Sequence, residues 1–213
     1  MKLRLALLLP ATLLGACSQT GQLTAENGGG IYAVRSSCPI AGIPAGTGDV
    51  TLFNPANNVT AAAIDVTATI TNLRANCHEE GDQLVSTLSF DVVATRRDPT
   101  EGRQVVLPYY DVVLRAGSEV TAKRVGRVGL TFAPGSYRAQ TSGQAYARVH
   151  RGAAALPADV QQTLNKPRKA GDPTAAVDPL TDPKIREAVA NATFEHLVGF
   201  QLTEQQLRYN VTR

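Results

Sequence analysis

Hydrophobic and polar residues alternate with a period of two along most of the chain. In residues 64–71, Ile64, Val66, Ala68 and Ile70 alternate with Asp and Thr residues, a pattern typical of a half-buried β-strand. Residues 84–95 alternate in the same way, but their second face is rich in β-branched residues and is expected to be partly covered. The remaining strand-like runs are 31–35, 50–53, 104–115, 120–132, 137–149 and 194–202.

Turn-forming residues separate these runs. They include Asn54-Pro55, Ala116-Gly117 and Pro134-Gly135, which favour a reversal of the chain. Eight short strands at roughly even spacing favour a two-sheet antiparallel β-sandwich over a barrel or an α/β fold, and we expect it to be immunoglobulin-like. Pro108 has no N–H to contribute to a sheet, so 104–115 is predicted to be an edge strand or two shorter strands.

The alternation stops between residues 151 and 193, where a short helical and Pro-rich excursion is expected before the last strand. Short helices are predicted over 157–164 and 183–191, the second with Asp182 as its N-cap. Since strand-like alternation returns at Phe194, we interpret 31–213 as one domain that contains this excursion. The spacing of Thr203 and Gln206 predicts a capping box for one short helical turn near the C-terminus.

The first residues have the order of a secretory signal peptide. Lys2 and Arg4 precede an apolar stretch over 5–14, which is followed by Gly15 and Ala16. Ten helical residues span about 15 Å, half of the ~30 Å hydrocarbon core, so a transmembrane helix is not expected. Residues 1–16 are therefore predicted to be a signal peptide.

The tetrapeptide Leu14-Gly15-Ala16-Cys17 resembles the lipobox of bacterial lipoprotein precursors. This resemblance covers residues 1–17 and implies cleavage after Ala16, a thioether-linked diacylglycerol on Cys17 and an acyl chain on its new amino group. In the enterobacterial members an Asp after the Cys retains the protein in the inner membrane, so Ser18 implies the periplasmic face of the outer membrane. The alternative is an ordinary cleaved signal peptide that leaves Cys17 as a free thiol. Residues 17–30 are expected to be the lipidated Cys and a flexible tether with a reach of about 20 Å.

The other two cysteines, Cys38 and Cys77, are an even pair in an oxidising compartment, which predicts a structural disulfide. A redox or metal role would require a close pair such as CxxC or a third ligand. The three His residues have no metal-ligand spacing, and the chain contains no GxSxG or P-loop motif. We therefore expect no metal, no cofactor and no catalysis.

Charge is unevenly distributed along the chain, whose formal net charge is +3. Residues 96–169 carry a net +8, whereas both flanking segments of the mature chain are acidic, which suggests contact with anionic lipid, lipopolysaccharide phosphates or an acidic partner. A solvated surface is the alternative, and nucleic acid is excluded by the compartment. The candidate contact residues are Arg96, Arg97, Arg103, Lys123, Arg127, Arg151, Lys166, Arg168 and Lys169.

Together these patterns predict a lipid-anchored envelope lipoprotein with a non-catalytic structural or macromolecule-binding role. Aromatic residues make up 5% of the chain and Trp is absent, which disfavours a binding site built on stacked aromatic rings. A periplasmic small-ligand carrier, with an apolar pocket between the sheets, is the first alternative. A hydrolytic enzyme, with clustered polar groups in a cleft, is the second.

Overall fold

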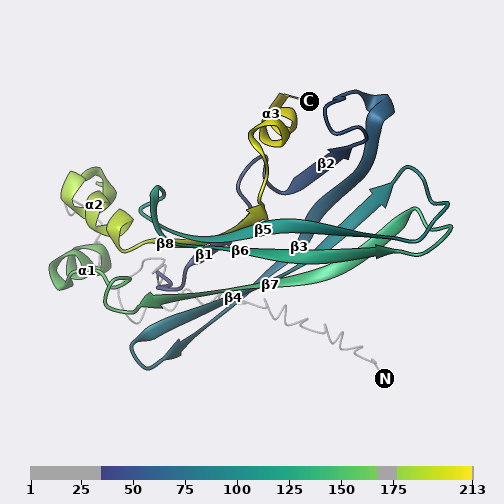
Figure 1. The fold of residues 1–213 in the computed structure, drawn as a ribbon. Helices are drawn as coiled ribbons and strands as arrows, with labels where there is room; N and C mark the ends of the chain where they lie inside the picture. The colour runs from purple at the N-terminus through teal and green to yellow at the C-terminus, as the bar shows by residue number, and fades with distance from the viewer. Residues whose placement is uncertain (1–34, 167–176, 213) are drawn as a thin grey trace, which may run out of the picture.

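The computed structural model describes residues 35–166 and 177–212. It has two four-stranded sheets, with the strand orders β1-β8-β5-β6 and β2-β3-β4-β7 (Figure 1). A mainly β architecture with two sheets is therefore confirmed. The strands are β1 (Ile40–Gly42), β2 (Asp49–Phe53), β3 (Ile64–Glu80), β4 (Gln83–Arg96), β5 (Arg103–Arg115), β6 (Glu119–Phe132), β7 (Arg138–His150) and β8 (Phe194–Phe200).

The main hydrophobic core lies between the two sheets. Val66 and Phe90 from one sheet belong to the same buried cluster as Leu130 and Phe200 from the other, and each of these side chains is at most 2% exposed. Burial of one such side chain contributes about 1.5–3 kcal/mol relative to leaving it exposed. The alternation seen in the sequence is thus the division between this core and the outer faces.

The predicted strand boundaries agree with the structure for β2, β4, β5, β6, β7 and β8 to within two residues. β1 was not predicted, and β3 continues nine residues beyond the predicted 64–71. The register of its pairing with β4 shifts between Thr71 and Arg74. β3 then continues beside β4 to a hairpin turn at Gly81, whose positive φ suits a two-residue turn. Main-chain pairing with β4, rather than apolar alternation, extends this strand. The predicted strand 31–35 lies, except for Arg35, outside the described residues.

The prediction that Pro108 marks an edge strand or a break was wrong. β5 is continuous and lies between β8 and β6. Its pairing with β8 starts only at Tyr109, and the carbonyl of Pro108 accepts a hydrogen bond from the N–H of Gln201 just beyond β8. The proline nitrogen faces this same side, opposite Gln201, which lies beyond the end of β8 and is exposed, so the sheet tolerates the missing N–H.

The immunoglobulin-like part of the fold prediction is not confirmed. In an immunoglobulin constant domain the strand orders are ABED and CFG, so that sheet partners are often distant in sequence. Here β2, β3 and β4 are three consecutive neighbours in one sheet. Most pairs are antiparallel, but β1 pairs with β8 in parallel.

A disulfide between Cys38 and Cys77 links the two sheets, as predicted. Cys38 lies two residues before β1, which belongs to one sheet, and Cys77 lies within β3 of the other. This cross-link closes a loop of 40 residues that contains β1 and β2. It therefore holds the segment before β1 against β3 of the other sheet.

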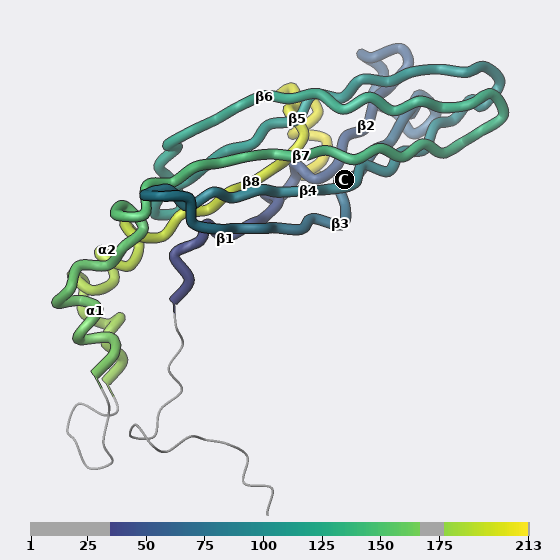
Figure 2. Tube along the Cα trace, turned by 90° about the horizontal axis from the view of Figure 1, so that it is seen from below, coloured from purple at the N-terminus to yellow at the C-terminus, as the bar shows by residue number. Residues whose placement is uncertain are grey.

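The helices form at the positions that the sequence predicted. α1 (Ala158–Asn165) and α2 (Pro183–Asn191) lie at one end of the strands (Figure 2). The Asp182 carboxylate caps α2 by accepting a hydrogen bond from the Lys184 N–H at 2.8 Å. Thr203 and Gln206 form the predicted capping box. The helix that follows, α3 (Glu204–Thr212), has nine residues rather than one turn, and Tyr209 packs edge-on against Phe53 of β2.

Candidate functional site

The basic residues predicted to form one anionic contact surface are distributed along the whole sandwich. Arg97 follows the end of β4, and Arg103 is the first residue of β5. Arg151 and Lys166 lie at the opposite end of the sandwich, near α1 and α2. β4 separates these two ends by about 40 Å, at 3.3 Å per residue. Arg168 and Lys169 lie outside the described residues. The net +8 of this segment is therefore not one continuous patch among the described residues.

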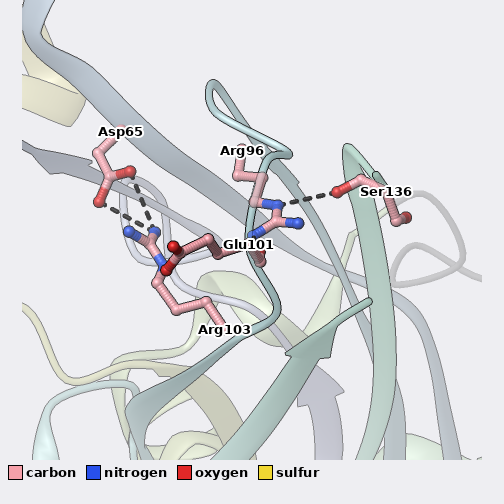
Figure 3. A network of polar contacts seen from close by, with 5 residues as sticks. All are labelled: Asp65, Arg96, Glu101, Arg103 and Ser136. Atoms are coloured by element: carbon pink, nitrogen blue, oxygen red, sulfur yellow. Dashed lines mark hydrogen bonds and ion pairs between the residues drawn. The ribbon is translucent and has the colours of Figure 1, made fainter. Parts of the chain in front are cut away.

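Arg96 does not belong to an exposed contact surface, because it is 6% exposed. Its guanidinium donates hydrogen bonds to the carbonyls of Ser136, at 2.8 Å, and Glu101 (Figure 3). It also donates to the carbonyls of Ala133 at 2.9 Å and Pro99 at 3.0 Å. The Arg96 Cζ also lies over the Phe132 ring, 5.0 Å from the ring centre. Arg96 thus connects the β4–β5 loop to the β6–β7 loop and has a structural role.

Two more of the predicted residues are paired with carboxylates. Arg103 bonds both oxygens of Asp65 at 3.0 Å (Figure 3), and Arg151 lies 3.1 Å from Glu79. These pairs are solvent-exposed and contribute little to stability. Their positive charge is locally balanced, so it is weakly available to an anionic partner.

Lys123 and Arg127 have a different environment. Both are exposed on β6, and their registers with Val112 and Pro108 place them on the outer face of the β1-β8-β5-β6 sheet. The Lys123 ammonium lies 5.2 Å from the centre of the Tyr110 ring on the same face. Because Lys123 and Arg127 are four residues apart on a regular stretch of β6, they lie on the same face of that strand.

Apolar side chains surround the two cations. We call this surface the apolar–basic face, and it consists of Ile40, Val106, Pro108, Tyr110, Leu114, Val120, Val125 and Leu197 together with Lys123 and Arg127. Val112 lies on the same side of the sheet but is buried. Four of these residues are more than half exposed: Ile40 at 60%, Val125 at 59%, Val120 at 58% and Val106 at 52%. Exposed apolar side chains that gather on one face mark an interaction surface more often than scattered ones do.

The outer face of the other sheet is polar by comparison. The hydroxyls of Thr67 and Thr95 are hydrogen-bonded across β3 and β4 at 2.7 Å. Asp91 accepts hydrogen bonds from Asn72 and Ser142 at 2.6 and 2.8 Å. The two outer faces therefore have different chemistry, although both belong to the same sandwich.

The apolar residues of this face are not among the site residues predicted from the sequence. The available signal was the consecutive apolar residues of β5, such as Val105-Val106-Leu107 and Val112-Val113-Leu114, where a strand with one wet face would alternate. Such runs indicate that both faces of a strand avoid water. They do not tell which face covers the core, because that depends on the sheet partner.

The interior of the sandwich also contains a polar pair that the sequence analysis missed. The Ser86 Oγ on β4 lies 2.9 Å from Nδ1 of His196 on β8, and the two residues are 1% and 0% exposed. Burial, with a smaller contribution from the charge of Arg124, lowers the pKa of His196 to about 4. The imidazole is therefore neutral at physiological pH and is enclosed between the sheets.

Polar side chains on the inner side of β5 and β6 cover the free edge of β7. The Tyr109 hydroxyl donates to the Gln144 carbonyl at 2.8 Å, and Arg124 donates to the Tyr146 carbonyl at 2.6 Å. Burial raises the pKa of Asp111 beside them, although the Arg124 charge and main-chain hydrogen bonds oppose that rise. These side chains occupy main-chain groups that an edge strand would otherwise present to another chain.

A surface cavity of about 370 Å³ lies at the end of the sandwich that carries α1 and α2. Small side chains such as Ala153 and Ala188 line it together with Arg115, Lys184 and Glu187. The Arg115 guanidinium is held there by the Asn191 carbonyl at 2.7 Å. The charged groups at the wall of this cavity are thus two cationic side chains and one carboxylate.

Two features are absent from the part of the chain that the structure describes. Residues 35–166 and 177–212 contain no cluster of three or more His, Cys, Asp or Glu side chains suited to a metal ion. No helix within those same ranges has the length and apolar character needed to cross a membrane. No protein-family model, curated protein or solved structure matches this chain.

Proposed function

We propose that this chain is a lipid-anchored envelope protein whose β-sandwich is a non-catalytic binding module. In this proposal Cys17 carries the lipid, the attachment is to the periplasmic face of the outer membrane, and the apolar–basic face contacts an envelope component. The lipobox-like tetrapeptide before Cys17 supports the anchor. The observation that carries the binding role is the contrast between the apolar–basic face and the polar outer face of the other sheet.

The arrangement of the polar groups favours binding over catalysis. Ser86 and His196 resemble a nucleophile and base in residue type, but each is at most 1% exposed and lies between the sheets. A substrate would have to separate the two sheets to reach the Ser86 hydroxyl. We therefore assign this pair to the core rather than to an active site.

A small-ligand carrier is the second candidate function. The space between the sheets is filled by large side chains such as Phe90, Phe132 and Phe200, so a ligand would instead use the cavity beside α2. Arg115 and Lys184 in its wall suit an anionic group, and the Ala residues suit a short apolar portion. Saturable binding of a small amphiphile that is abolished by Ala188→Phe would favour this candidate.

Two measurements test the proposed function. Mass spectrometry of the amino terminus of the membrane-extracted protein is expected to show diacylglycerol on Cys17, whereas an unmodified soluble product would contradict the anchor. A photo-reactive residue at Val106 of the apolar–basic face is expected to crosslink an envelope component in intact cells. The matched control is the same residue at Gln140, which is exposed on the polar outer face. Identical crosslinks from both positions would contradict a binding role for the apolar–basic face.

A further inference from the structure

The apolar–basic face combines side chains that suit a lipid surface. Val106, Val120 and Val125 extend from β5 and β6 with more than half of their surface exposed. Apolar residues of this kind gain free energy when they enter the boundary between lipid head groups and acyl chains, in proportion to the apolar area they bury. Lys123 and Arg127 lie on the same face, where their charges reach anionic head groups.

The charge on this face has one sign at the exposed positions. Lys123 and Arg127 are exposed, whereas Glu195, the acidic residue that the described pairing places on this face, is half-buried. A second copy of the chain would place the same two cations against this face, which is electrostatically unfavourable. An anionic surface complements it instead, and each Lys or Arg near such a surface contributes about a five-fold gain in binding.

The position of the face in the chain brings it close to the membrane. Ile40, its most exposed apolar residue, follows Cys17 by 23 positions. Arg35 is held at the α2 end of the same sheet, where its guanidinium donates hydrogen bonds to the carbonyls of Ala154, at 3.1 Å, and Ala192. Even fully extended, residues 18–34 span no more than about 60 Å, so a lipid on Cys17 keeps this face near the bilayer.

We propose that the apolar–basic face docks on the anionic lipid surface of the membrane that holds the anchor. This inference rests on the proposed function, because it requires the lipid on Cys17. The domain then lies with the β1-β8-β5-β6 sheet against the lipid and the β2-β3-β4-β7 sheet toward the periplasm. Ile40, Val120 and Val125 enter the head-group boundary, while Lys123 and Arg127 pair with lipid phosphates.

The absence of Trp from the sequence allows a direct test. The mature lipidated protein with Val125→Trp is reconstituted into vesicles that contain phosphatidylglycerol or only phosphatidylcholine, each with brominated acyl chains. Val93→Trp is the matched control, because Val93 is 40% exposed on the polar outer face. We expect blue-shifted emission and bromine quenching for Val125→Trp in the anionic vesicles, and neither effect for Val93→Trp.

Removal of the charges separates electrostatic docking from simple proximity. Adding Lys123→Gln and Arg127→Gln to Val125→Trp is expected to lower the docked-to-undocked ratio about 30-fold at low salt. Raising the salt concentration of the parent protein is expected to weaken docking in the same direction. Quenching that is unchanged by both treatments would overturn the proposal.

The remaining outcomes distinguish the two proposals. Lipidated Cys17 with an unquenched Trp at position 125 would overturn docking and leave the anchor intact. Unmodified Cys17 in the same sample would overturn the proposed function itself. Blue-shifted emission without vesicles that increases with protein concentration would show that a second copy covers the face, and would also overturn docking on lipid.

Discussion

Ser86 and His196 face each other across the two sheets, with Oγ 2.9 Å from Nδ1, and neither side chain is more than 1% exposed. Nε2 of the same imidazole is buried without a hydrogen-bond partner among the described residues. The pair thus provides a hydrogen-bond partner for only one of the two imidazole nitrogens. A proton on His196 would place an uncompensated charge inside the core, which is costly.

Acid is therefore expected to destabilise the fold through His196. Its pKa is about 4 in the folded protein and about 6.5 when unfolded, so below pH 6.5 the unfolded chain binds a proton that the folded chain does not. The free energy of unfolding should fall as the pH drops from 6.5 to 4, by about 3 kcal/mol in total. Urea titrations at a series of pH values measure this effect.

Most carboxylates with a shifted pKa act below the range in which His196 acts. Hydrogen bonds from neighbouring side chains lower the pKa of Asp82, Asp91 and Asp98, so the stability they contribute is lost only below about pH 4. Asp111 differs, because burial raises its pKa, and its protonation in the folded protein opposes the effect of His196 as the pH falls. A free energy of unfolding that is constant between pH 6.5 and 4.5 would contradict a buried neutral His196.

Removing the disulfide is expected to destabilise the protein by about 4 kcal/mol. Cys38 and Cys77 close a loop of 40 residues, and the cross-link restricts the unfolded chain. The double variant Cys38→Ala with Cys77→Ala should unfold at a lower urea concentration than the oxidised parent. Reduction of the parent should produce a similar loss, and equal midpoints for the oxidised and reduced protein would disagree with this expectation.

Loss of the Arg96 guanidinium should destabilise the two loops that it joins. Arg96→Met retains an unbranched apolar stem but removes hydrogen bonds to four main-chain carbonyls. We expect a loss of about 2–4 kcal/mol, measured by chemical unfolding. Arg97→Met, at the neighbouring exposed position, should change stability by no more than about 0.5 kcal/mol. Equal effects of the two substitutions would show that the buried guanidinium has no special role.

Gly143 of β7 should not tolerate a side chain. A Cβ at this position would lie 2.3 Å from Cζ of Phe90, which is 2% exposed in the core. Gly143→Ala is expected to cost about 1–3 kcal/mol, because Phe90 must move within a packed interior. At Gly102 the nearest atom would be 3.4 Å away, so Gly102→Ala is the control for a general effect of removing glycine. A melting temperature unchanged by Gly143→Ala would contradict this packing.

Local patterns in the sequence determined most of the strands and helices. Alternation placed β4, β6 and β7 to within two residues, because each strand buries one side of its own backbone. The Asp182 cap and the Thr203–Gln206 capping box are contacts within a few residues, so they were also visible. The Cys38–Cys77 pair followed from counting cysteines. These features depend on neighbours in the chain or on the number of partners available.

Contacts between distant segments were decided only by the tertiary structure. Arginine is a residue type that usually lies on the surface. The burial of Arg96 depends on carbonyls from two loops, including those of Ala133 and Ser136. Pro108 lies within a central strand because β8 ends beside it. The apolar–basic face exists because β1 and β8 lie beside the β5–β6 hairpin in one sheet, although β1, the hairpin and β8 are far apart in sequence. A sequence shows which side chains avoid water, but the order of the strands decides which of them remain exposed.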